Sequence, residues 1–600
     1  MATTVEVAGA PPDTTAEHPG VGDRAPRWLS RRVALAVLAA VSVQFVVLSL
    51  HQAWNDAPTF DEPVYMATGL ATLYDGELRL NNEAPFFTRA VNALPLRIAG
   101  VDVPLDGAWA EADTIDGDTW FLPYVLAEEF TSLHAERGEL QRAVLIGRLM
   151  AVVEGFAIGL VLYALGATLF SRGAGLLAAG AWLTTPWVVG FGHINSIDLA
   201  FTLAVVAAAL ALVRYLQAPS WRTLAVLALA AGALQLTRQT GFLYVGVICV
   251  AVVVRRWRDG WDAARDVAVV VVATWALVWV ATLAVAPTRV PVDRAAVDET
   301  LDDIGATEQG AVAGLLSRAV DVVPWPAEYE VGFQTQLAGS QVDTQGFLLG
   351  DMWWGARPSY WPLTMLVKLP ITVIALMLVG PFAWLALRRE QRRLAALVVV
   401  LPALVAFAFV LPYNKPIGLR YAMPGIALLL VVASPLALVL VRRRAGYAIL
   451  GVAVLAQLAF LWSSVPHSLS WTTPPFRPGY QVVSESNLDW GQDGYRLADW
   501  MEGRTGHVAF FGSASVVDGT PGFRPLIGAP PEEITGWAAV SASQLTIHSR
   551  DELAYLRAYC NVGTIAGTVL LYRFDEPPID EPGPEEPAGR CDGPVSERVR

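Results

Sequence analysis

An adjacent pair of carboxylates, Asp61 and Glu62, follows the first long apolar segment of the chain, in the stretch TFDEPVYMATG. Pro58 and Pro63 restrict the backbone on either side, and the residues from Tyr65 onward predict an amphipathic helix. A carboxylate near a helix N-terminus is stabilised in its ionised form by the helix dipole. An ionised carboxylate that is held in place can accept a proton from a hydroxyl or amine nucleophile. The alternative for such a pair is a solvated surface loop.

Two further acidic residues lie beside apolar segments. Asp198, in the stretch GFGHINSIDLAF with His193, opens an apolar segment and could be a helix cap, a role for which Ser196 competes. An ionisable residue that enters a membrane span is costly, so Asp198 is a functional candidate by default. Glu83 lies with Arg89 in LRLNNEAPFFTRA, a stretch that could also be an interfacial helix with an aromatic anchor.

Several cations lie close to the ends of apolar segments. Arg238 lies in a tight turn between two such segments, and Lys368 lies inside one. Lys415 and Arg420 precede another. Each side chain alone could extend to lipid headgroups. Together they predict a binding site for an anion at the membrane surface, and a lipid phosphate is the simplest candidate.

The composition indicates a membrane protein. The 600 residues are 54% hydrophobic and only 16% charged, with a mean hydropathy of +0.44, which is too apolar for a soluble chain of this length. The net charge of -13, without a basic stripe, argues against a nucleic-acid partner. The sequence has no P-loop and no glycine-rich dinucleotide motif between a strand and a helix, which argues against ATP-driven work.

The apolar residues form blocks of about twenty, the length that a helix needs to cross a bilayer. We predict a polytopic α-helical membrane protein with about eleven spans. The first span is predicted to be retained, since it lacks the small-residue cleavage site of a signal peptide. The predicted spans are 31–51, 142–169, 173–190, 196–216, 221–236, 239–255, 266–286, 361–387, 394–412, 419–441 and 445–464.

Arginine clusters orient these spans. With eleven spans, every cluster falls on one face of the membrane, which the positive-inside rule makes cytoplasmic. The N-terminus is then cytoplasmic, and the segments 52–141, 287–360 and 465–600 are extracytoplasmic. The clusters are Arg24 with Arg27, Arg31 and Arg32; Arg172; Arg214 with Arg222; Arg255, Arg256, Arg258 and Arg265; Arg388, Arg389, Arg392 and Arg393; and Arg442, Arg443 and Arg444.

The chain divides into four predicted parts. These are a disordered cytoplasmic tail (1–30), a transmembrane core (31–464), a small extracytoplasmic α/β domain (465–575) and an acidic, proline-rich disordered tail (576–600).

Periodicity within the α/β domain predicts buried strands at 507–512 and 566–574 and an amphipathic helix at 551–559. Cys560 and Cys591 either pair as a disulfide or stay as two free thiols, and the sequence favours neither.

These segments resemble those of the GT-C membrane glycosyltransferases, in particular the bacterial glycosyltransferase family 39 group, to which protein O-mannosyltransferases and the lipid A aminoarabinose transferase are related. FDEPVYMATGLATLYDGELRLNNEAPFFTR is similar to the family stretch that runs from an acidic pair to a Glu-His-Pro-Pro-Leu-x-Lys segment. SNLDWGQDGYRL (486–497) resembles a signature found after the last span in many bacterial members. GFLLGDMWWGARPSYWPLTMLVKLP (346–370) and IGLRYAMP (417–424) also resemble family segments. The resemblance covers most of residues 50–575.

The resemblance implies roles for individual residues. Asp61 is the candidate general base, Glu62 supports it or contacts the acceptor, and Asp198 occupies the second acidic position of the family. In the motif near the C-terminus, Asp489 and Asp493 are interpreted mainly as structural residues that dock the external domain. The predicted ligands of the donor phosphate are Arg89, Arg238, Lys368 and Arg420, and the predicted substrate contacts are Glu83, His193 and Tyr65.

The sequence departs from the family pattern at a few positions. Ala84 and Phe86 stand where His and the second Pro are usual, and Ile197 precedes Asp198 where a hydroxyl residue is common. Arg89 stands in place of Lys, which keeps the charge and changes the donor geometry. These departures bear on the donor sugar more than on the fold.

We therefore expect an inverting glycosyltransferase of the cell membrane. It would move a sugar from a polyprenyl-phosphate donor to an extracytoplasmic acceptor, which is a protein hydroxyl, a glycolipid or a cell-wall glycan. The alternative is a membrane transporter or a lipid-binding scaffold without enzymatic activity, although the sequence has no paired inverted repeats.

The need for a divalent metal ion stays open at this stage. Some members of the superfamily use one and others do not. Oxygen and nitrogen ligands could come from Asp61, Glu62, His193 and Asp198, but their spacing does not decide the question.

Overall fold

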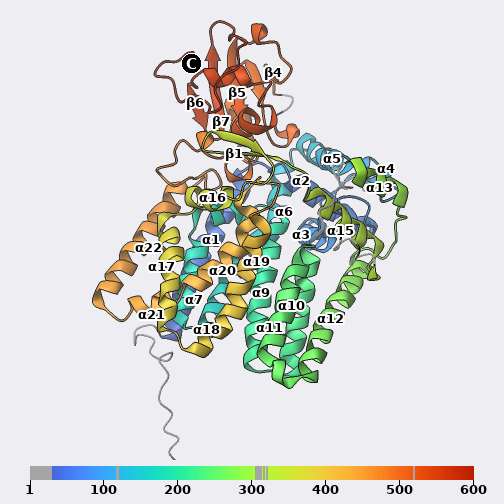
Figure 1. Ribbon diagram of the computed structural model, residues 1–600. Coiled ribbons are helices and arrows are strands. Elements are labelled where there is room, and N and C mark those ends of the chain that lie inside the picture. Colours follow the sequence, from blue (N-terminus) through green and yellow to red (C-terminus); the bar gives the residue numbers. More distant parts are fainter. Residues whose placement is uncertain are drawn as a thin grey trace, which may run out of the picture.

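The computed structural model describes residues 30–116, 121–303, 322–517 and 520–599, with Gly314 and Arg318 between them. A bundle of helices carries a layer of short helices at one end, and a small sheet domain lies beyond that layer (Figure 1). The N-terminal tail predicted over 1–30 lies outside the described residues except for Ser30.

Seven helical segments of the described chain are long and apolar enough to cross a membrane. Most are exposed along one side, as expected of helices that contact lipid. They are α1 (Arg31–Asn55), α6 (Leu140–Leu169), α9 (Ile197–Gln217), α12 (Trp261–Val285), α18 with α19 (Arg389–Ala395 and Leu401–Val410), α20 with α21 (Met423–Ala433 and Leu436–Leu440) and α22 (Arg444–Ser464). The chain is therefore a multi-span helical membrane protein, as predicted.

The remaining predicted spans are also helical, but they are shorter or interrupted. Proline explains two of the breaks, because it cannot donate a backbone hydrogen bond: Pro186 begins α8, and Pro370 lies between α16 and α17. These elements are α7 (Arg172–Leu183), α8 (Pro186–Phe191), α10 (Trp221–Thr237), α11 (Gly241–Arg256), α16 (Tyr360–Lys368) and α17 (Ile371–Val379).

The segments 52–141 and 287–360 fold over one end of the bundle. Figure 1 shows α2, α3, α5 and α15 gathered between the long helices and the sheet domain. This layer holds most of the acidic candidate residues. Its elements are α2 (Glu62–Asp75), α3 (Phe86–Ile98), α4 (Ala108–Glu111), α5 (Leu122–Glu136), α13 (Arg294–Asp303), α15 (Ala327–Gly339) and the antiparallel pair β1 (Gln345–Leu348) and β2 (Asp351–Trp354).

The C-terminal domain is a mixed five-stranded sheet in the order β4-β3-β5-β7-β6. The β3 strand is parallel to both β4 and β5, whereas β7 is antiparallel to β5 and β6. Its elements are α23 (Gly494–Met501), β3 (Gly506–Ala509), β4 (Phe523–Pro525), β5 (Gly536–Ser541), β6 (Gly563–Ile565) and β7 (Val569–Phe574). The predicted strand 507–512 overlaps β3, and the predicted strand 566–574 contains β7.

Two local predictions differ from the structure. The predicted helix 551–559 is only a 3₁₀ segment, Ala554–Ala558, although Leu553 and Leu556 are buried as its periodicity suggested. The predicted disordered tail 576–600 packs against the domain over its described residues, 576–599. Tyr559 and Arg598 form an isolated antiparallel bridge.

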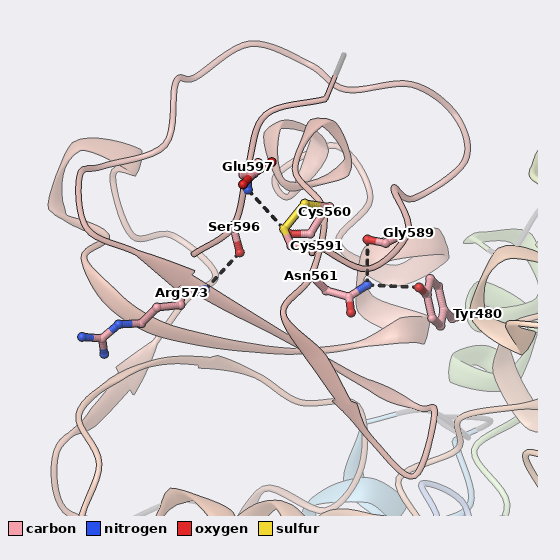
Figure 2. The surroundings of a disulfide bond; sticks show 8 residues. All are labelled: Tyr480, Cys560, Asn561, Arg573, Gly589, Cys591, Ser596 and Glu597. Carbon is pink, nitrogen blue, oxygen red and sulfur yellow. Dashed lines mark hydrogen bonds between the residues drawn. A yellow bond between two sulfur atoms is a disulfide. The ribbon is translucent and has the colours of Figure 1, made fainter. Parts of the chain in front are cut away.

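A disulfide between Cys560 and Cys591 fixes this returning segment (Figure 2). Beside it, Asn561 donates hydrogen bonds to the hydroxyl of Tyr480 and to the carbonyl of Gly589. The composition of residues 576–600 predicted disorder, because composition carries no information about a covalent link to a folded sheet. The structure thus selects the paired state for the two cysteines.

Candidate functional site

Asp61 lies at the N-terminus of α2 and faces two side chains from distant parts of the chain. Its Oδ2 accepts a hydrogen bond from Arg420 Nη1 at 3.0 Å, and its Oδ1 accepts one from the Tyr124 hydroxyl at 3.3 Å. The Asp61 side chain is 17% exposed, so the carboxylate is enclosed but still reachable. Such a carboxylate is placed to meet an incoming hydroxyl.

Asp198 extends the same group of charges. It lies in the first turn of α9, where Arg238 Nη1 donates to its Oδ1 at 2.8 Å. Arg420 Nη1 lies 4.0 Å from Asp198 Oδ2 and so stands between the two acids. We call Asp61, Asp198, Arg238 and Arg420 the acid–arginine cluster. Both guanidinium groups also lie over the ring of Tyr421, at 4.8 Å for Arg238 and 5.4 Å for Arg420.

Glu62 has a different environment from its neighbour. Its two oxygens accept from Arg148 Nε at 2.9 Å and Nη2 at 2.6 Å, and the backbone N–H groups of Thr59 and Asn195 complete the set. Glu62 and Arg148 are both fully buried. Because Arg148 also donates to the carbonyls of Ala53, Asp56 and Ala57, the pair ties the loop after α1 to α6. Glu62 thus anchors the Asp61 loop and has no free face for an acceptor.

The two adjacent carboxyls differ in pKa. Burial raises the pKa of Asp61 above its usual value, against the opposing effect of the Arg420 charge. Burial acts on Glu62 in the same direction, but the charge and hydrogen bonds of Arg148 hold the Glu62 pKa below its usual value. Asp61 is therefore the more basic of the two carboxylates.

Glu83, Arg89 and Tyr65 lie close to the cluster. Burial raises the pKa of Glu83, which faces Lys415, Asp61 and Arg89. Arg89 is 1% exposed, and its side chain donates a hydrogen bond from Nη1 to the Leu80 carbonyl, at 3.0 Å. Its Nε and Nη2 are buried without a hydrogen-bond partner among the described residues. Burial lowers the pKa of Arg89 to about 10, so its side chain stays charged at neutral pH. The two unpaired donors favour an incoming anion.

Tyr65 projects from the first turns of α2 toward the same charges. Burial, followed by the charge of Asp61, raises the pKa of its hydroxyl well above the usual value. It therefore stays protonated and can act as a neutral hydrogen-bond donor beside Asp61.

Two predicted site residues are committed elsewhere. Lys368 is fully buried at the end of α16, and its Nζ donates to the carbonyls of Leu469 and Trp471. His193 is fully buried with its Nε2 3.2 Å from Asp56 Oδ2. The sequence reveals the polarity of these residues, but it does not reveal that other backbone and side-chain groups already occupy them.

An apolar pocket adjoins the cluster at Arg238. It is small, with a cavity volume of about 20 Å³, and lies between α9, α11, α19 and α20. Its lining is hydrophobic and aromatic apart from Arg238 and Thr240. The lining residues are Phe201, Arg238, Thr240, Leu243, Tyr244, Val405, Ala406, Phe409, Val410, Tyr421 and Pro424.

The metal donor set suggested by the sequence is not assembled. Within the described residues, no group of three or more His, Cys, Asp or Glu side chains is placed to hold a metal ion. Glu62 binds Arg148, while Asp61 and Asp198 bind Arg420 and Arg238. These donors do not fit a cation, because each acid already faces a guanidinium.

Sequence reasoning missed three residues of the site. Tyr124 bonds to Asp61, Trp490 packs its ring 4.2 Å from the Arg420 guanidinium, and Arg148 binds Glu62. Arg148 did carry a signal, since it is a charged residue inside a predicted span. Trp490 lies in the SNLDWGQDGYRL motif, which drew attention to the segment but not to this contact. Tyr124 carried no signal.

The fold and the site together define a class: a multi-span membrane protein with paired acids and arginines beside an apolar pocket. Residues 133–285 match the family described as dolichyl-phosphate-mannose-protein mannosyltransferase. This segment includes α6, α9 and α10 and carries Asp198 and Arg238. This match confirms the predicted resemblance to the membrane glycosyltransferases over residues 133–285.

Several solved structures match the chain at low sequence identity. The oligosaccharyltransferase of Archaeoglobus fulgidus in its apo form matches with 12% identity and a TM-score of 0.46, covering 92% of this chain and 76% of that one. ArnT from Cupriavidus metallidurans matches with 13% identity in the apo state, covering 90% of this chain and 97% of that one at a TM-score of 0.32. The same protein bound to undecaprenyl phosphate matches with 13% identity, 90% and 98% coverage and a TM-score of 0.31. No curated protein matches the sequence.

Proposed function

We propose that the protein transfers a sugar, with inversion, from a polyprenyl-phosphate donor to a hydroxyl group outside the cytoplasm. The observation that carries the proposal is the acid–arginine cluster, in which Asp61 and Arg420 are 3.0 Å apart and Arg238 borders the apolar pocket. The prenyl chain would lie along the apolar side chains around this pocket, with its phosphate beside Arg238 and Arg420. The anomeric carbon would then lie within reach of Asp61.

The residues suggest the following reaction. Asp61 accepts the proton of the acceptor hydroxyl while that oxygen attacks the anomeric carbon. The bond from the anomeric carbon to the phosphate oxygen breaks, and the polyprenyl phosphate leaves with the bonding electrons. Arg238 and Arg420 stabilise the negative charge that develops on the leaving phosphate. Asp198 orients Arg238, and Arg89 offers a further positive charge near Glu83 and Tyr65.

The proposed arrangement in the membrane has eleven spans, with the site on the extracytoplasmic face of the cell membrane. The α11–α12 turn and α18 lie at the end of the bundle away from the sheet domain (Figure 1), and Arg255 and Glu390 at that end are 3.6 Å apart. Arginine-rich ends favour the cytoplasm. The disulfide at the opposite end favours an oxidising compartment.

Several finer points belong to the proposal. The acceptor is a protein hydroxyl, a glycolipid or a cell-wall glycan, and mannose is one donor sugar to test. No step is assigned to a divalent cation, because the acids of the cluster are paired with arginines. The ArnT structure bound to undecaprenyl phosphate and an archaeal oligosaccharyltransferase AglB structure in complex with an inhibitory peptide and a dolichol-phosphate indicate which carrier and acceptor classes to try. A transporter or lipid scaffold is the competing function.

The decisive experiment measures sugar transfer in membranes that contain wild type, Asp61→Asn or Asp102→Asn at equal expression. A panel of radiolabelled polyprenyl-phosphate sugars is supplied, and label is followed into lipid, protein and glycan fractions, with and without EDTA. Asp102 is the matched control, an external carboxylate that is paired with Arg137 at 2.6 Å and is largely exposed.

We expect wild type and Asp102→Asn to transfer one sugar, with or without EDTA, and Asp61→Asn to lose at least about 100-fold of the rate. Transfer that survives in Asp61→Asn would remove Asp61 as the base. Loss of transfer with EDTA would require a metal site. An active protein reconstituted in vesicles that moves a lipid or solute without transferring sugar would favour the competing function.

A further inference from the structure

The SNLDWGQDGYRL motif, residues 486–497, has no role in the proposed sugar-transfer reaction. It lies between α22 and the sheet domain, and its residues from Ser486 to Gly494 are all buried. Two aspartates, an asparagine and a glutamine are buried in this short segment, so their polar groups need hydrogen-bond partners. Those partners come from three parts of the protein that meet at the site.

One side of the motif grips the segment that carries Arg420. Asn487 accepts from the Leu419 backbone N–H at 2.9 Å and donates to the Tyr360 hydroxyl at 2.7 Å. Ser486 donates to the Ile417 carbonyl at 2.6 Å. The residues immediately before Arg420 are therefore held at two backbone points.

The centre of the motif grips the loop that carries Asp61. The Phe60 N–H donates to the Trp490 carbonyl at 2.9 Å, and the Ala57 N–H donates to the Gln492 carbonyl at 2.8 Å. The Gln492 side chain braces the turn internally, since it accepts from the Trp490 N–H and donates to the Leu488 carbonyl. Both points of contact precede Asp61 by a few residues.

Glycine is required at the turn between these two contacts. Gly491 has a φ of +96°, and a Cβ there would lie 2.7 Å from Gly512 Cα and 2.8 Å from the Phe511 carbonyl oxygen. A side chain would push the motif away from the sheet domain.

The Trp490 indole completes the arrangement. Its ring centroid is 4.2 Å from the Arg420 guanidinium carbon, the shorter of the two ring contacts of that arginine. Arg420 is about 5% exposed, and its Nε has no hydrogen-bond partner among the described residues. The aromatic face therefore limits where the guanidinium can sit relative to Asp61.

The other end of the motif belongs to the sheet domain. Asp489 accepts from the Ser543 N–H at 3.0 Å, and Asp493 accepts from the Thr568 hydroxyl at 2.7 Å. Arg496 then returns to the core, where it donates to Asp56 at 2.9 Å.

We infer that this motif sets the separation of Asp61 and Arg420, with Trp490 as the positioning residue, so that the sheet domain is part of the transfer site. The inference rests on the proposed function for the roles of Asp61 and Arg420. The positioning of Asp61 and Arg420 by the motif is a statement about geometry and can be tested without measuring transfer.

The test compares Trp490→Phe with Trp490→Leu in the full-length protein. Both remove the indole and keep an apolar side chain, but only Phe keeps an aromatic face for Arg420. Trp537→Leu is the control, because Trp537 lies in β5 of the same domain and packs on Trp500 at 5.1 Å. Two readouts are taken: the pH profile of kcat/KM for transfer, and hydrogen exchange of the peptide that contains residues 57–62.

The pH profile reports on Asp61 through the groups that face it. Arg420 opposes the effect of burial on the Asp61 pKa, so a displaced Arg420 should move the acidic limb to higher pH. The charged and titratable groups that face Asp61 are Arg420 and Tyr421 from the Leu419–Ala422 turn, Tyr124 from α5, Glu485 from the Glu485–Asn487 turn, Tyr65 from α2, and Glu83.

We expect Trp490→Leu to lower kcat/KM by about 100-fold, to move the acidic limb up by about one pH unit and to speed exchange over 57–62. Trp490→Phe should recover most of the rate and the wild-type limb. Trp537→Leu should leave the limb and the exchange unchanged. The inference is overturned if Trp490→Leu keeps both the wild-type limb and wild-type exchange, or if Phe and Leu behave alike. If wild type transfers no sugar, the proposed function fails. The hydrogen-exchange comparison alone then decides whether the motif holds the Asp61 loop in place.

Discussion

At the residue scale, two adjacent carboxylates of the same chemistry have opposite environments. Glu62 accepts two hydrogen bonds from the buried Arg148 guanidinium and two from backbone N–H groups, so all of its capacity is used. Asp61 shares its arginine with Asp198 and keeps a partly exposed side chain. One acid is therefore fully committed to partners within the fold, and the other keeps a partly exposed side chain.

The pH dependence of transfer should reflect the raised pKa of Asp61. A general base works only when ionised, so activity should fall as the pH drops through a value above about 3.9, the ordinary pKa of aspartic acid. The measurement is kcat/KM from pH 4 to pH 9. An acidic limb at or below the ordinary carboxyl value would contradict the assignment.

Replacing Glu62 should affect stability far more than replacing Asp61. Glu62→Gln leaves the Arg148 charge buried without its counter-charge, which costs about 3–5 kcal/mol. The folded pKa of Glu62 is depressed, so its contribution is present at neutral pH and is lost as the pH falls through that folded value. Thermal unfolding in detergent should show a large drop in Tm for Glu62→Gln and little change for Asp61→Asn. Equal Tm values for the two variants would contradict the division of roles.

At the element scale, a break between two helices of the bundle holds the connection to the sheet domain. The α16 helix ends at Lys368, just before Pro370, and the ammonium donates to two carbonyls of the segment that follows α22. The break leaves a buried cation close to the backbone that leads into the sheet domain. Lys368 is thus a structural tie between two elements that are distant in sequence.

Lys368→Met should destabilise the protein without weakening donor binding. The substitution leaves two carbonyls unsatisfied at about 1–3 kcal/mol each. Arg238→Ala is the contrasting variant, because Arg238 borders the apolar pocket. This substitution should raise the KM for the polyprenyl-phosphate donor by about tenfold or more. Tm and donor KM are measured for both. A raised donor KM in Lys368→Met at unchanged Tm would return Lys368 to the phosphate site.

At the scale of the whole molecule, the membrane core and the sheet domain share polar contacts rather than a flexible linker. The C-terminal segment returns to the sheet and is fixed by the Cys560–Cys591 disulfide (Figure 2). The bridge closes a loop with a sequence separation of 31, which restricts the unfolded domain.

Removing this disulfide should destabilise the sheet domain and leave the proposed sugar transfer unchanged. Cys560→Ser with Cys591→Ser should cost about 2–4 kcal/mol, seen as a lower temperature for protease cleavage of the domain. Transfer at low temperature should match wild type. In intact cells, a membrane-impermeant maleimide should label the wild-type pair only after reduction by an impermeant reductant. Labelling that requires permeabilised cells would reverse the proposed orientation.

The sequence by itself determined the membrane class, the approximate limits of most helices and the acidic pair as a candidate. Hydropathy and arginine placement are properties of short segments, so they can be read along the chain. Composition was misleading for 576–599, where a covalent bridge outweighs polarity. Only the tertiary structure decided which acid stays partly exposed. Arg148 is 86 residues from Glu62, and Arg420 is 359 residues from Asp61. A charge acquires its role from the partner that packing brings to it, and that partner is not encoded in the neighbouring residues.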